Sequence, residues 1–500
     1  MENRLSRRGF LGSVAAFAAL GQGAFAAPPA ESLRPVLRDA DFYKKAIPEV
    51  SQIINGHKLS GRVAFALADV QSGAWLECAH EHVGTPPASV TKAITALYAL
   101  EVLGAEHRFE TKLVATGGIA DGEVQGDLIL VGGGDPTLDT DVLAQMAADL
   151  KVAGVVAVKG GLKVYQGALP FVARIDPEQP DHVGYNPAVT GIALNFNRVH
   201  FEWRRNSGKY TVTMDGRSKK YRPDVTFAAM QIEDRATPVY TYRDQAGRDQ
   251  WSVARGALGG SGARWLPVRK PALYAGEVFA TLAGAHGIRL GKPEVIAALP
   301  AHEVVVRHES QGLRMILRDM LRYSTNLTAE MVGLAATQKR VGRVNGLQAS
   351  AAEMNRWAVA ALGMQAPKLV DHSGLGDAST LTALDMTRAL LAVKDADFRA
   401  ILKQFGFRDG KGRPVKEQAV AVDAKTGTLN FVSSLAGYMT GQDGREMAFA
   451  IFASDMGARS RISRADRESP AGARTYNKRA KRVQQALIER WDALYGRKGV

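Results

Sequence analysis

Three short motifs, spread from residue 89 to residue 427, constrain this 500-residue chain more than any other feature. They are Ser89-Val90-Thr91-Lys92, Ser324-Thr325-Asn326 and Lys425-Thr426-Gly427. A Ser-x-x-Lys tetrapeptide alone is a weak signal, because ordinary use of Ser and Lys gives about one match in a chain this long. Here it occurs only at Ser89, and the three motifs in this order are a far more specific signal.

The first motif pairs a nucleophile with a base. A serine hydroxyl reacts poorly until a base takes its proton. We expect a helix to begin at Ser89, and i, i+3 spacing then puts Ser89 and Lys92 on one face. The positive end of that helix favours negative charge on Ser89. Lys92 is a base only when neutral, and burial beside a second cation, Lys425, would lower its pKa enough.

The second motif supplies polar groups beside that base. We expect Ser324 to relay a proton between Lys92 or Lys425 and the leaving amine. Asn326 would hold Lys92 and a substrate amide, because its side chain both donates and accepts hydrogen bonds. These three motifs resemble the constellation of penicillin-recognising serine acyltransferases, in which they line one site.

The third motif provides a substrate-binding strand. Lys425, with the hydroxyls of Thr426 and Thr428, would bind a terminal carboxylate. Gly427 has no side chain, so the strand can approach a substrate backbone closely. The backbone N–H groups of Ser89 and Thr428 would form the oxyanion hole.

Longer segments resemble the low-molecular-mass class C penicillin-binding proteins, the D-alanyl-D-alanine carboxypeptidase/endopeptidases. The resemblance covers most of the chain, from about residue 35 to residue 495. The segments that carry it are Gly126–Leu138, Ala193–Asn197, Asp371–Leu375, Lys425–Leu429 and Ser433–Tyr438. It implies cleavage of the terminal D-Ala from peptidoglycan stem peptides through an acyl-enzyme on Ser89. It also implies cleavage of D-Ala–diaminopimelate crosslinks and covalent binding of β-lactams.

The same resemblance implies a multi-domain α/β fold. A β-lactamase/transpeptidase-like domain, with an antiparallel five-stranded sheet flanked by helices, is interrupted by two nested inserted domains. The spacing agrees, because more than two hundred residues separate Lys92 from Ser324 although both line one site in this class. We expect a signal peptide at 1–26, the catalytic domain at 27–105 and 306–500, one insert at 106–190 and 269–305, and a β-rich nested domain at 191–268.

Local patterns place the elements. Alternation and turn residues predict a hairpin over 62–78 and a meander over 434–452, while helical spacing predicts helices over 138–153, 271–286, 313–321 and 328–337. The stripe Val483, Leu487, Trp491 and Leu494 predicts a final helix. We favour packing of that stripe on the sheet over membrane binding, although basic residues beside it keep peripheral membrane contact open.

One motif departs from the family. The family commonly reads Asp-Gly-Ser-Gly-Leu-Ser-Arg, whereas this chain has Asp371-His-Ser-Gly-Leu-Gly-Asp377. Asp377 thus replaces an arginine that would face an acidic stem-peptide side chain, and we hypothesise that it weakens crosslink cleavage relative to carboxypeptidase activity. Asp135 and Asn430 are candidate contacts on the same side chain. Asp135 is explained slightly better as a turn-forming residue before Pro136.

The N-terminus predicts export. Ser6-Arg7-Arg8-Gly9-Phe10-Leu11, a short apolar run and Ala24-Phe25-Ala26 are typical of a twin-arginine signal peptide, so we expect a periplasmic protein. A retained anchor helix is the less favoured alternative, because the apolar run is short. The single cysteine, Cys78, cannot form an intrachain disulfide and is expected to be a small buried hydrophobe.

Net charge and histidine spacing bear on partners. A net charge of +14 suits an anionic wall or membrane surface, or simply a solvated basic face. The export signal and the lack of a binding motif argue against nucleic acid. We expect no cofactor and no metal, because His80-Glu81-His82 lacks further ligands at metal-site spacing. The sequence leaves the oligomeric state open.

Two other functions remain for the same motifs. A serine β-lactamase or esterase would need an acidic group that activates the deacylating water, and no convincing motif for one is present. A non-catalytic wall-binding protein need not retain all five of the polar groups in the motifs, which are Ser89, Lys92, Ser324, Asn326 and Lys425.

Overall fold

The computed structural model describes residues 47–393 and 396–496. The predicted signal peptide, residues 1–26, lies outside these ranges. In the described ranges, no helix combines the length and the apolar character needed to cross a membrane.

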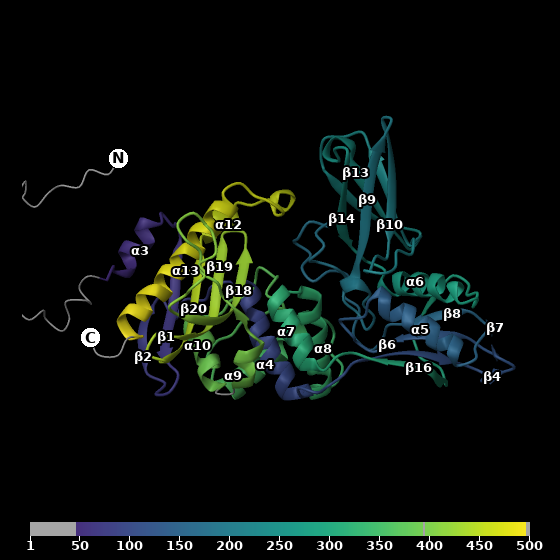
Figure 1. Cartoon of the computed structure of the whole chain (residues 1–500), viewed down its shortest axis with the longest axis horizontal. Helices are drawn as coiled ribbons and strands as arrows, with labels where there is room; N and C mark the ends of the chain where they lie inside the picture. The colour runs from purple at the N-terminus through teal and green to yellow at the C-terminus, as the bar shows by residue number, and fades with distance from the viewer. Residues whose placement is uncertain (1–46, 394–395, 497–500) are drawn as a thin grey trace, which may run out of the picture. The chain divides into compact units, whose positions relative to one another are not determined.

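A six-stranded antiparallel sheet is the centre of the part of the fold that carries the motifs (Figure 1). Its strand order is β17-β18-β19-β20-β1-β2. The predicted five strands are all present, and the sixth is the two-residue edge strand β17, which pairs with β18 only at Asp423 and Ala424. The bounds are β1 Arg62–Asp69, β2 Trp75–Ala79, β17 Lys403–Gln404, β18 Ala421–Leu429, β19 Val432–Thr440 and β20 Glu446–Ser454.

Alternation along β1 explains why both faces of this sheet are covered. Val63, Phe65 and Leu67 point to one face and pack with helices α3 (Val50–Gly56) and α13 (Ala473–Tyr495). Ala64 and Ala66 point to the other face, where small side chains let helices pack closely. Those helices are α4 Thr91–Leu103, α7 Leu313–Tyr323, α8 Asn326–Val341, α9 Leu347–Leu362 and α10 Ala383–Ala392.

The predicted final helix is α13, Ala473–Tyr495. Val483, Leu487 and Trp491 are fully buried against the sheet, and Leu494 is half-buried. The apolar stripe is therefore a core-facing stripe, as favoured. Cys78, at the other edge of the sheet, is a free, half-buried thiol whose pKa is raised by burial.

A second, five-stranded sheet lies between the first and second motifs in sequence, with the order β15-β8-β6-β3-β16. Helices α5 (Thr140–Val152) and α6 (Pro271–Ala285) share its apolar core. Its strands are β3 Glu110–Ala115, β6 Leu128–Gly132, β8 Leu162–Tyr165, β15 Glu294–Ile296 and β16 Glu303–Glu309. Because β16 pairs with β3, it belongs to this sheet and crosses the boundary predicted at 305/306. The other domain boundaries stay predictions.

The region between β8 and α6 is rich in strands, as the alternation there predicts. It holds two three-stranded sheets, ordered β10-β9-β14 and β11-β13-β12. Their strands are β9 Arg198–Asn206, β10 Lys209–Asp215, β11 Ala228–Glu233, β12 Tyr240–Gln245, β13 Arg248–Ala254 and β14 Ser261–Pro267. Fully buried aromatic residues, Phe201 and Trp251 among them, join these sheets to the apolar core of the five-stranded sheet.

Candidate active site

Lys92 is the centre of a buried polar group at the start of α4. Its Nζ lies 3.0 Å from Ser89 Oγ, 2.7 Å from Asn326 Oδ1 and 2.7 Å from the Ser373 carbonyl oxygen. The Lys92 side chain is fully buried, and this burial lowers its pKa to about 8. An appreciable fraction of Lys92 is therefore neutral near neutral pH, and a neutral amine can accept the Ser89 proton.

The Ser89 segment differs slightly from the predicted helix start. Ser89 lies in the 3-10 turn η1 (Ala88–Val90), and the α-helix begins at Thr91. Ala88 has a positive φ of 48°, which is uncommon for a residue with a side chain. Such conformations are retained where the surrounding structure imposes them, and they concentrate at functional sites.

Ser324 and Lys425 form a second pair beside the first. Lys425 Nζ donates to Ser324 Oγ at 3.1 Å and to the Thr426 carbonyl oxygen at 2.6 Å. Burial, and then repulsion by Lys92, lower the pKa of Lys425 well below its usual value. Ser324 follows the last residue of α7 in the left-handed conformation (φ 58°) and turns the chain into α8, whose first residue is Asn326. The structure thus brings all five predicted polar groups together.

Gly427 is needed for a close approach within the protein. A Cβ atom added there would lie 2.7 Å from the Pro87 carbonyl oxygen and 3.1 Å from the Ser89 nitrogen. The missing side chain therefore lets β18 press against the turn that carries Ser89, rather than only against a substrate as we predicted. Gly374, with φ +74°, presses against the same turn from the other side, since its Cβ would lie 1.9 Å from the Ala88 carbonyl oxygen.

The outer edge of β18 is free where the third motif lies. Because β17 ends its pairing at Ala424, no strand of the described chain pairs with this edge from Lys425 to Leu429. An exposed strand edge can bind an extended peptide by main-chain hydrogen bonds. Thr426 is half-buried and Thr428 is exposed at this edge.

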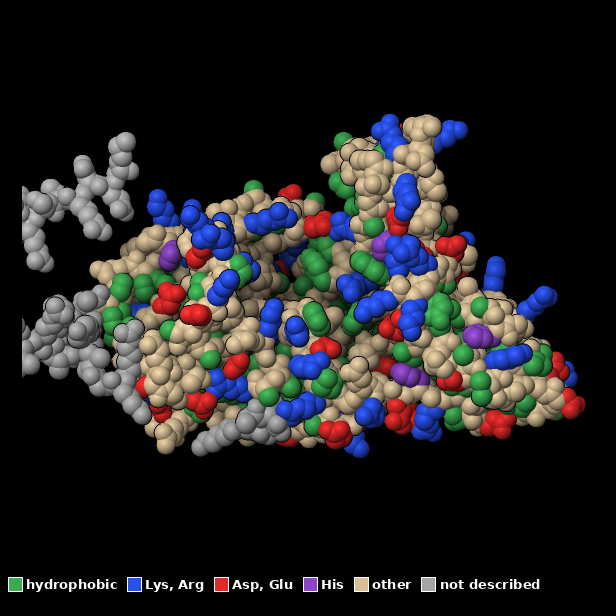
Figure 2. Space-filling model, viewed as in Figure 1, with side chains coloured by type: hydrophobic (Ala, Val, Ile, Leu, Met, Phe, Trp, Pro, Cys, Tyr) green, Lys and Arg blue, Asp and Glu red, His purple; other side chains and the backbone are tan. Residues whose placement is uncertain are grey.

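A cleft of about 320 Å³ lies along this edge, and the surface is visibly hollowed there (Figure 2). Ser89, Ser324, Asn326, Thr428 and Asn430 line it, as do Gln179 and Tyr185 from the segment that follows β8. Asn326 Nδ2 donates to the Tyr185 carbonyl oxygen at 3.0 Å. The cleft therefore has walls from segments far apart in the sequence.

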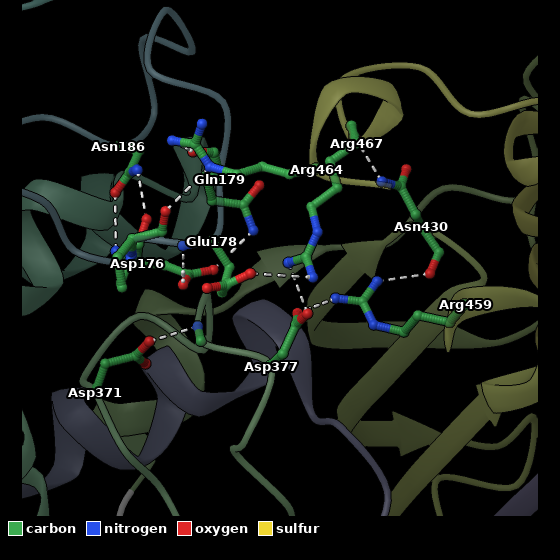
Figure 3. Close-up of polar contacts among 12 residues, drawn as sticks. Asp176, Glu178, Gln179, Asn186, Asp371, Asp377, Asn430, Arg459, Arg464 and Arg467 are labelled. Carbon is green, nitrogen blue, oxygen red and sulfur yellow. Dashed lines mark hydrogen bonds and ion pairs between the residues drawn. The ribbon is translucent and has the colours of Figure 1, made fainter. Parts of the chain in front are cut away.

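Asp377 lies at one end of the cleft, but it is not an isolated negative charge. Its carboxylate pairs with the guanidinium groups of Arg459 and Arg467, the latter at 2.8 Å (Figure 3). Asn430 joins the same group, accepting from Arg459 Nη1 at 2.7 Å and donating to the Arg467 carbonyl oxygen at 2.6 Å. Asp377 is therefore not an uncompensated negative charge, because two arginines distant in sequence face it. Glu178 lies 3.9 Å from Arg467, so the four side chains have no net formal charge. The effect of Asp377 on crosslink cleavage stays a prediction.

Residues 459–468, which we call the bridging segment, also reach the chain that follows β8. Arg464 Nη2 donates to the Gln179 carbonyl oxygen at 2.9 Å and to Asp181 Oδ1 at 3.1 Å. Glu468 pairs with His182 at 2.7 Å and with Arg264 at 2.5 Å. Figure 3 shows Arg464 extending across the end of the cleft toward Gln179. The bridging segment therefore closes this end of the cleft.

Asp135 does not belong to the cleft. Its side chain is buried after β6, and Oδ1 accepts hydrogen bonds from the Thr137 backbone nitrogen at 2.8 Å and from the Thr137 hydroxyl at 2.6 Å. These bonds agree with the turn-forming interpretation. The alternative of a substrate contact at Asp135 stays a prediction. Among the described residues, no group of His, Cys, Asp and Glu side chains has an arrangement that could hold a metal ion.

Comparison with known proteins agrees with this geometry. Residues 47–471 match the D-Ala-D-Ala carboxypeptidase 3 (S13) family. The chain belongs to this family. It is 29% identical over 453 residues to a D-alanyl-D-alanine carboxypeptidase of Actinomadura sp. (strain R39), covering 83% of this chain and 82% of the relative. It is 24% identical over 393 residues to the D-alanyl-D-alanine carboxypeptidase DacB of Haemophilus influenzae, covering 73% of this chain and 79% of the relative.

The fold also matches that of a solved penicillin-binding protein. The crystal structure of penicillin-binding protein 4 (dacB) from Haemophilus influenzae matches 88% of this chain and 100% of its own, with a TM-score of 0.69 and 18% identity. The predicted family and the predicted fold class are therefore confirmed. The roles given to individual residues from the S13 motifs stay predictions.

Two contacts of Lys92 and Asn326 escaped the sequence reasoning. The Ser373 carbonyl oxygen binds Lys92, and the Tyr185 carbonyl oxygen binds Asn326, but no side-chain pattern can mark a backbone acceptor. Glu330 also escaped it, although it is a charged residue in a nearly apolar part of α8, one turn after Asn326. That position was a usable signal, because a fully buried carboxylate requires partners.

Proposed function

We propose that this protein is a serine-type D-Ala-D-Ala carboxypeptidase that acts on peptidoglycan stem peptides through an acyl-enzyme on Ser89. The observation that carries the proposal is the position of the buried Lys92 Nζ, 3.0 Å from Ser89 Oγ and 2.7 Å from Asn326 Oδ1. A base with a lowered pKa within hydrogen-bond reach of a serine hydroxyl is the arrangement that activates a nucleophile.

Acylation follows from this arrangement. Neutral Lys92 takes the Ser89 proton as Oγ attacks the carbonyl carbon between the two D-Ala residues. The carbonyl oxygen becomes an oxyanion held by the N–H groups of Ser89 and Thr428. Ser324, linked to Lys425 at 3.1 Å, passes its own proton to the leaving amine and takes in turn the proton that Lys92 took from Ser89, directly or through Lys425. Lys92 is thereby neutral again. The C–N bond then breaks, terminal D-Ala leaves as a neutral amine, and the peptide remains as an ester on Ser89.

Deacylation reverses these proton movements. Water attacks the ester carbonyl as neutral Lys92 accepts its proton, and Lys92 returns that proton to Ser89 Oγ when the C–O bond breaks. The peptide lies as an added strand on the free edge of β18 in both steps. Its terminal carboxylate is bound by Lys425, Thr426 and Thr428 during acylation and departs with D-Ala. Cleavage of D-Ala–diaminopimelate crosslinks would use the same groups, because it breaks an amide at the same carbonyl.

The same site would be acylated by β-lactams. A crystal structure of the Haemophilus influenzae protein is a complex with a β-lactam, and its fold matches this chain with a TM-score of 0.67. Ring opening on Ser89 blocks departure of the leaving group, so the ester accumulates. We also propose that the protein works in the periplasm, on the basis of its N-terminal twin-arginine pattern.

Covalent labelling with a fluorescent penicillin tests the proposal. Parent protein and Ser89→Ala are incubated with the reagent and separated under denaturing conditions, and D-Ala release from a pentapeptide is measured in parallel. We expect a label and D-Ala release in the parent and neither in the variant. A folded parent that takes no label and releases no D-Ala refutes the proposal, and rapid nitrocefin turnover by that sample would indicate a β-lactamase instead.

A further inference from the structure

Glu330 is a buried acid without a part in the chemistry proposed above. It lies on α8, four residues after Asn326 and so on the same helix face, and it is fully buried. Its two carboxylate oxygens accept separate backbone hydrogen bonds, from the His372 nitrogen at 3.0 Å and from the Ser373 nitrogen at 2.9 Å. Both oxygens thus bind the loop of residues 371–376, which comes after α9 in the chain.

That loop presents one acceptor to Lys92. The Ser373 carbonyl oxygen lies 2.7 Å from Lys92 Nζ. The N–H of the same peptide group, that of Gly374, donates to Asp371 Oδ1 at 2.6 Å, and Asp371 Oδ2 accepts from the Gly376 nitrogen at 2.6 Å. Two buried carboxylates therefore bind four N–H groups of this loop, those of residues 372, 373, 374 and 376. The same loop carries the carbonyl oxygen that binds Lys92.

From this arrangement we propose that Glu330 is a positioning residue, which fixes the Ser373 carbonyl oxygen against Lys92 Nζ and whose carboxylate acts on the charge of Lys92. Asp371 supports it from the other side of the same peptide group. The proposal rests on the proposed function only in that Lys92 acts as a base on Ser89.

The charges around Lys92 agree with this role. The acids that face it are Glu330 from α8 and Asp371 from the loop, and the cation is Lys425 from β18. Burial lowers the pKa of Lys92 to about 8, and the carboxylates of Glu330 and Asp371 act in the opposite direction. His372 contributes no charge, because burial lowers its pKa to about 3. Burial and the neighbouring Asp371 raise the pKa of Glu330 to about 8, and burial also raises the pKa of Asp371. The N–H groups of His372 and Ser373 and the charge of Lys92 act in the opposite direction, because they favour the Glu330 carboxylate. Where Glu330 is ionised, removing its carboxylate should make Lys92 neutral at a lower pH.

The loop is also packed so that it cannot adjust freely. His372 is fully buried, and its Nε2 lies 2.7 Å from Ser350 Oγ. A Cβ atom added to Gly333, one turn after Glu330 on α8, would lie 2.2 Å from the His372 ring. Gly374 lies against the turn that carries Ser89. A loop held this tightly transmits a change at Glu330 to Lys92 rather than absorbing it.

The test is the pH profile of acylation in Glu330→Gln, which keeps the size of the side chain but removes its charge. The acylation rate by a fluorescent penicillin is measured from pH 5 to pH 10 for the parent, for Glu330→Gln and for Glu489→Gln, which changes an exposed acid on α13. We expect Glu330→Gln to lower the plateau rate about tenfold or more and to move the acid limb about one pH unit lower. Glu489→Gln should match the parent.

Two results would overturn the proposal. One is a Glu330→Gln profile identical to that of the parent, and the other is a lowered plateau with an unmoved acid limb, which would make Glu330 a structural residue only. If Glu330→Gln does not fold, as judged by its thermal transition, Asp371→Asn is measured against the same two criteria. Loss of the proposed function is distinguishable, because the parent itself would then take no label.

Discussion

Gly427→Ala provides a sharp test of how the fold supports the site. The added methyl group would lie 2.7 Å from the Pro87 carbonyl oxygen and 3.1 Å from both the Ala88 Cβ and the Ser89 nitrogen. Ordinary contact needs about 3.4 Å or more, so β18 and the turn that carries Ser89 must separate by roughly 0.5 Å or more. None of the atoms met is the free end of a flexible side chain, so the backbone itself has to move.

Two effects of different size should follow. Overpacking of this kind costs about 1–3 kcal/mol of stability, which a chain with large separate cores should tolerate. The acylation rate should be affected more strongly than the stability, because a displacement of about 1 Å in a reacting group costs on the order of 100-fold in rate. We therefore expect acylation to slow about 10- to 100-fold in a protein that still folds.

The assay is a time course of labelling by a fluorescent penicillin, with the thermal transition measured on the same samples. Gly260→Ala is the matched control, because a Cβ at Gly260 would meet no atom within 4 Å. Gly260→Ala should label at the parent rate. If Gly427→Ala also labels at the parent rate and melts at the parent temperature, the close approach of β18 to the Ser89 turn does not govern the reactivity of Ser89.

Three further predictions concern the charges of the cleft. Burial lowers the pKa of Lys92 to about 8, and the neutral amine is the base. The acylation rate of the parent should therefore rise as the pH increases through about 8 and level off above it. A rate that does not depend on pH from 6 to 10 would contradict this. Arg467→Gln removes one of the two cations that face Asp377. KM for a stem peptide with a diaminopimelate carboxylate should then rise several-fold while kcat changes little. An unchanged KM would show that this end of the cleft does not contact the substrate. Arg464→Ala should raise the rate on crosslinked relative to monomeric peptides by opening the end that the bridging segment closes, and an unchanged ratio in steady-state kinetics would argue against that closure.

Contacts that follow from chain periodicity were predictable from the sequence. Spacing i, i+3 puts Ser89 and Lys92 together, and alternation in β1 and the stripe on α13 identify the two faces of the sheet. The short motifs also predicted which distant segments meet, because their chemistry requires a common site. The strand β17 was not predictable, since two residues of pairing leave no periodic signal.

Contacts made by backbone atoms, and charges paired across long sequence separations, were not predictable in the same way. Asp377 read alone suggested a reversed charge, and only the folded chain brings Arg459 and Arg467 to it. The surroundings of Asp135 were not visible in the sequence either. Its motif also forms a local turn, in which Oδ1 of the Asp135 carboxylate accepts two hydrogen bonds from Thr137.

The long-range contacts of the site act together on the pKa of Lys92. Two lysines, Lys92 and Lys425, are buried next to each other, and burial together with their repulsion favours loss of a proton from one of them. Two buried carboxylates, Glu330 and Asp371, oppose that loss, so the pKa of Lys92 settles at about 8 instead of falling as far as burial alone would take it. The buried acids are bonded to the loop backbone rather than to Lys92 itself, and this keeps Lys92 Nζ available to Ser89 while still adjusting its basicity.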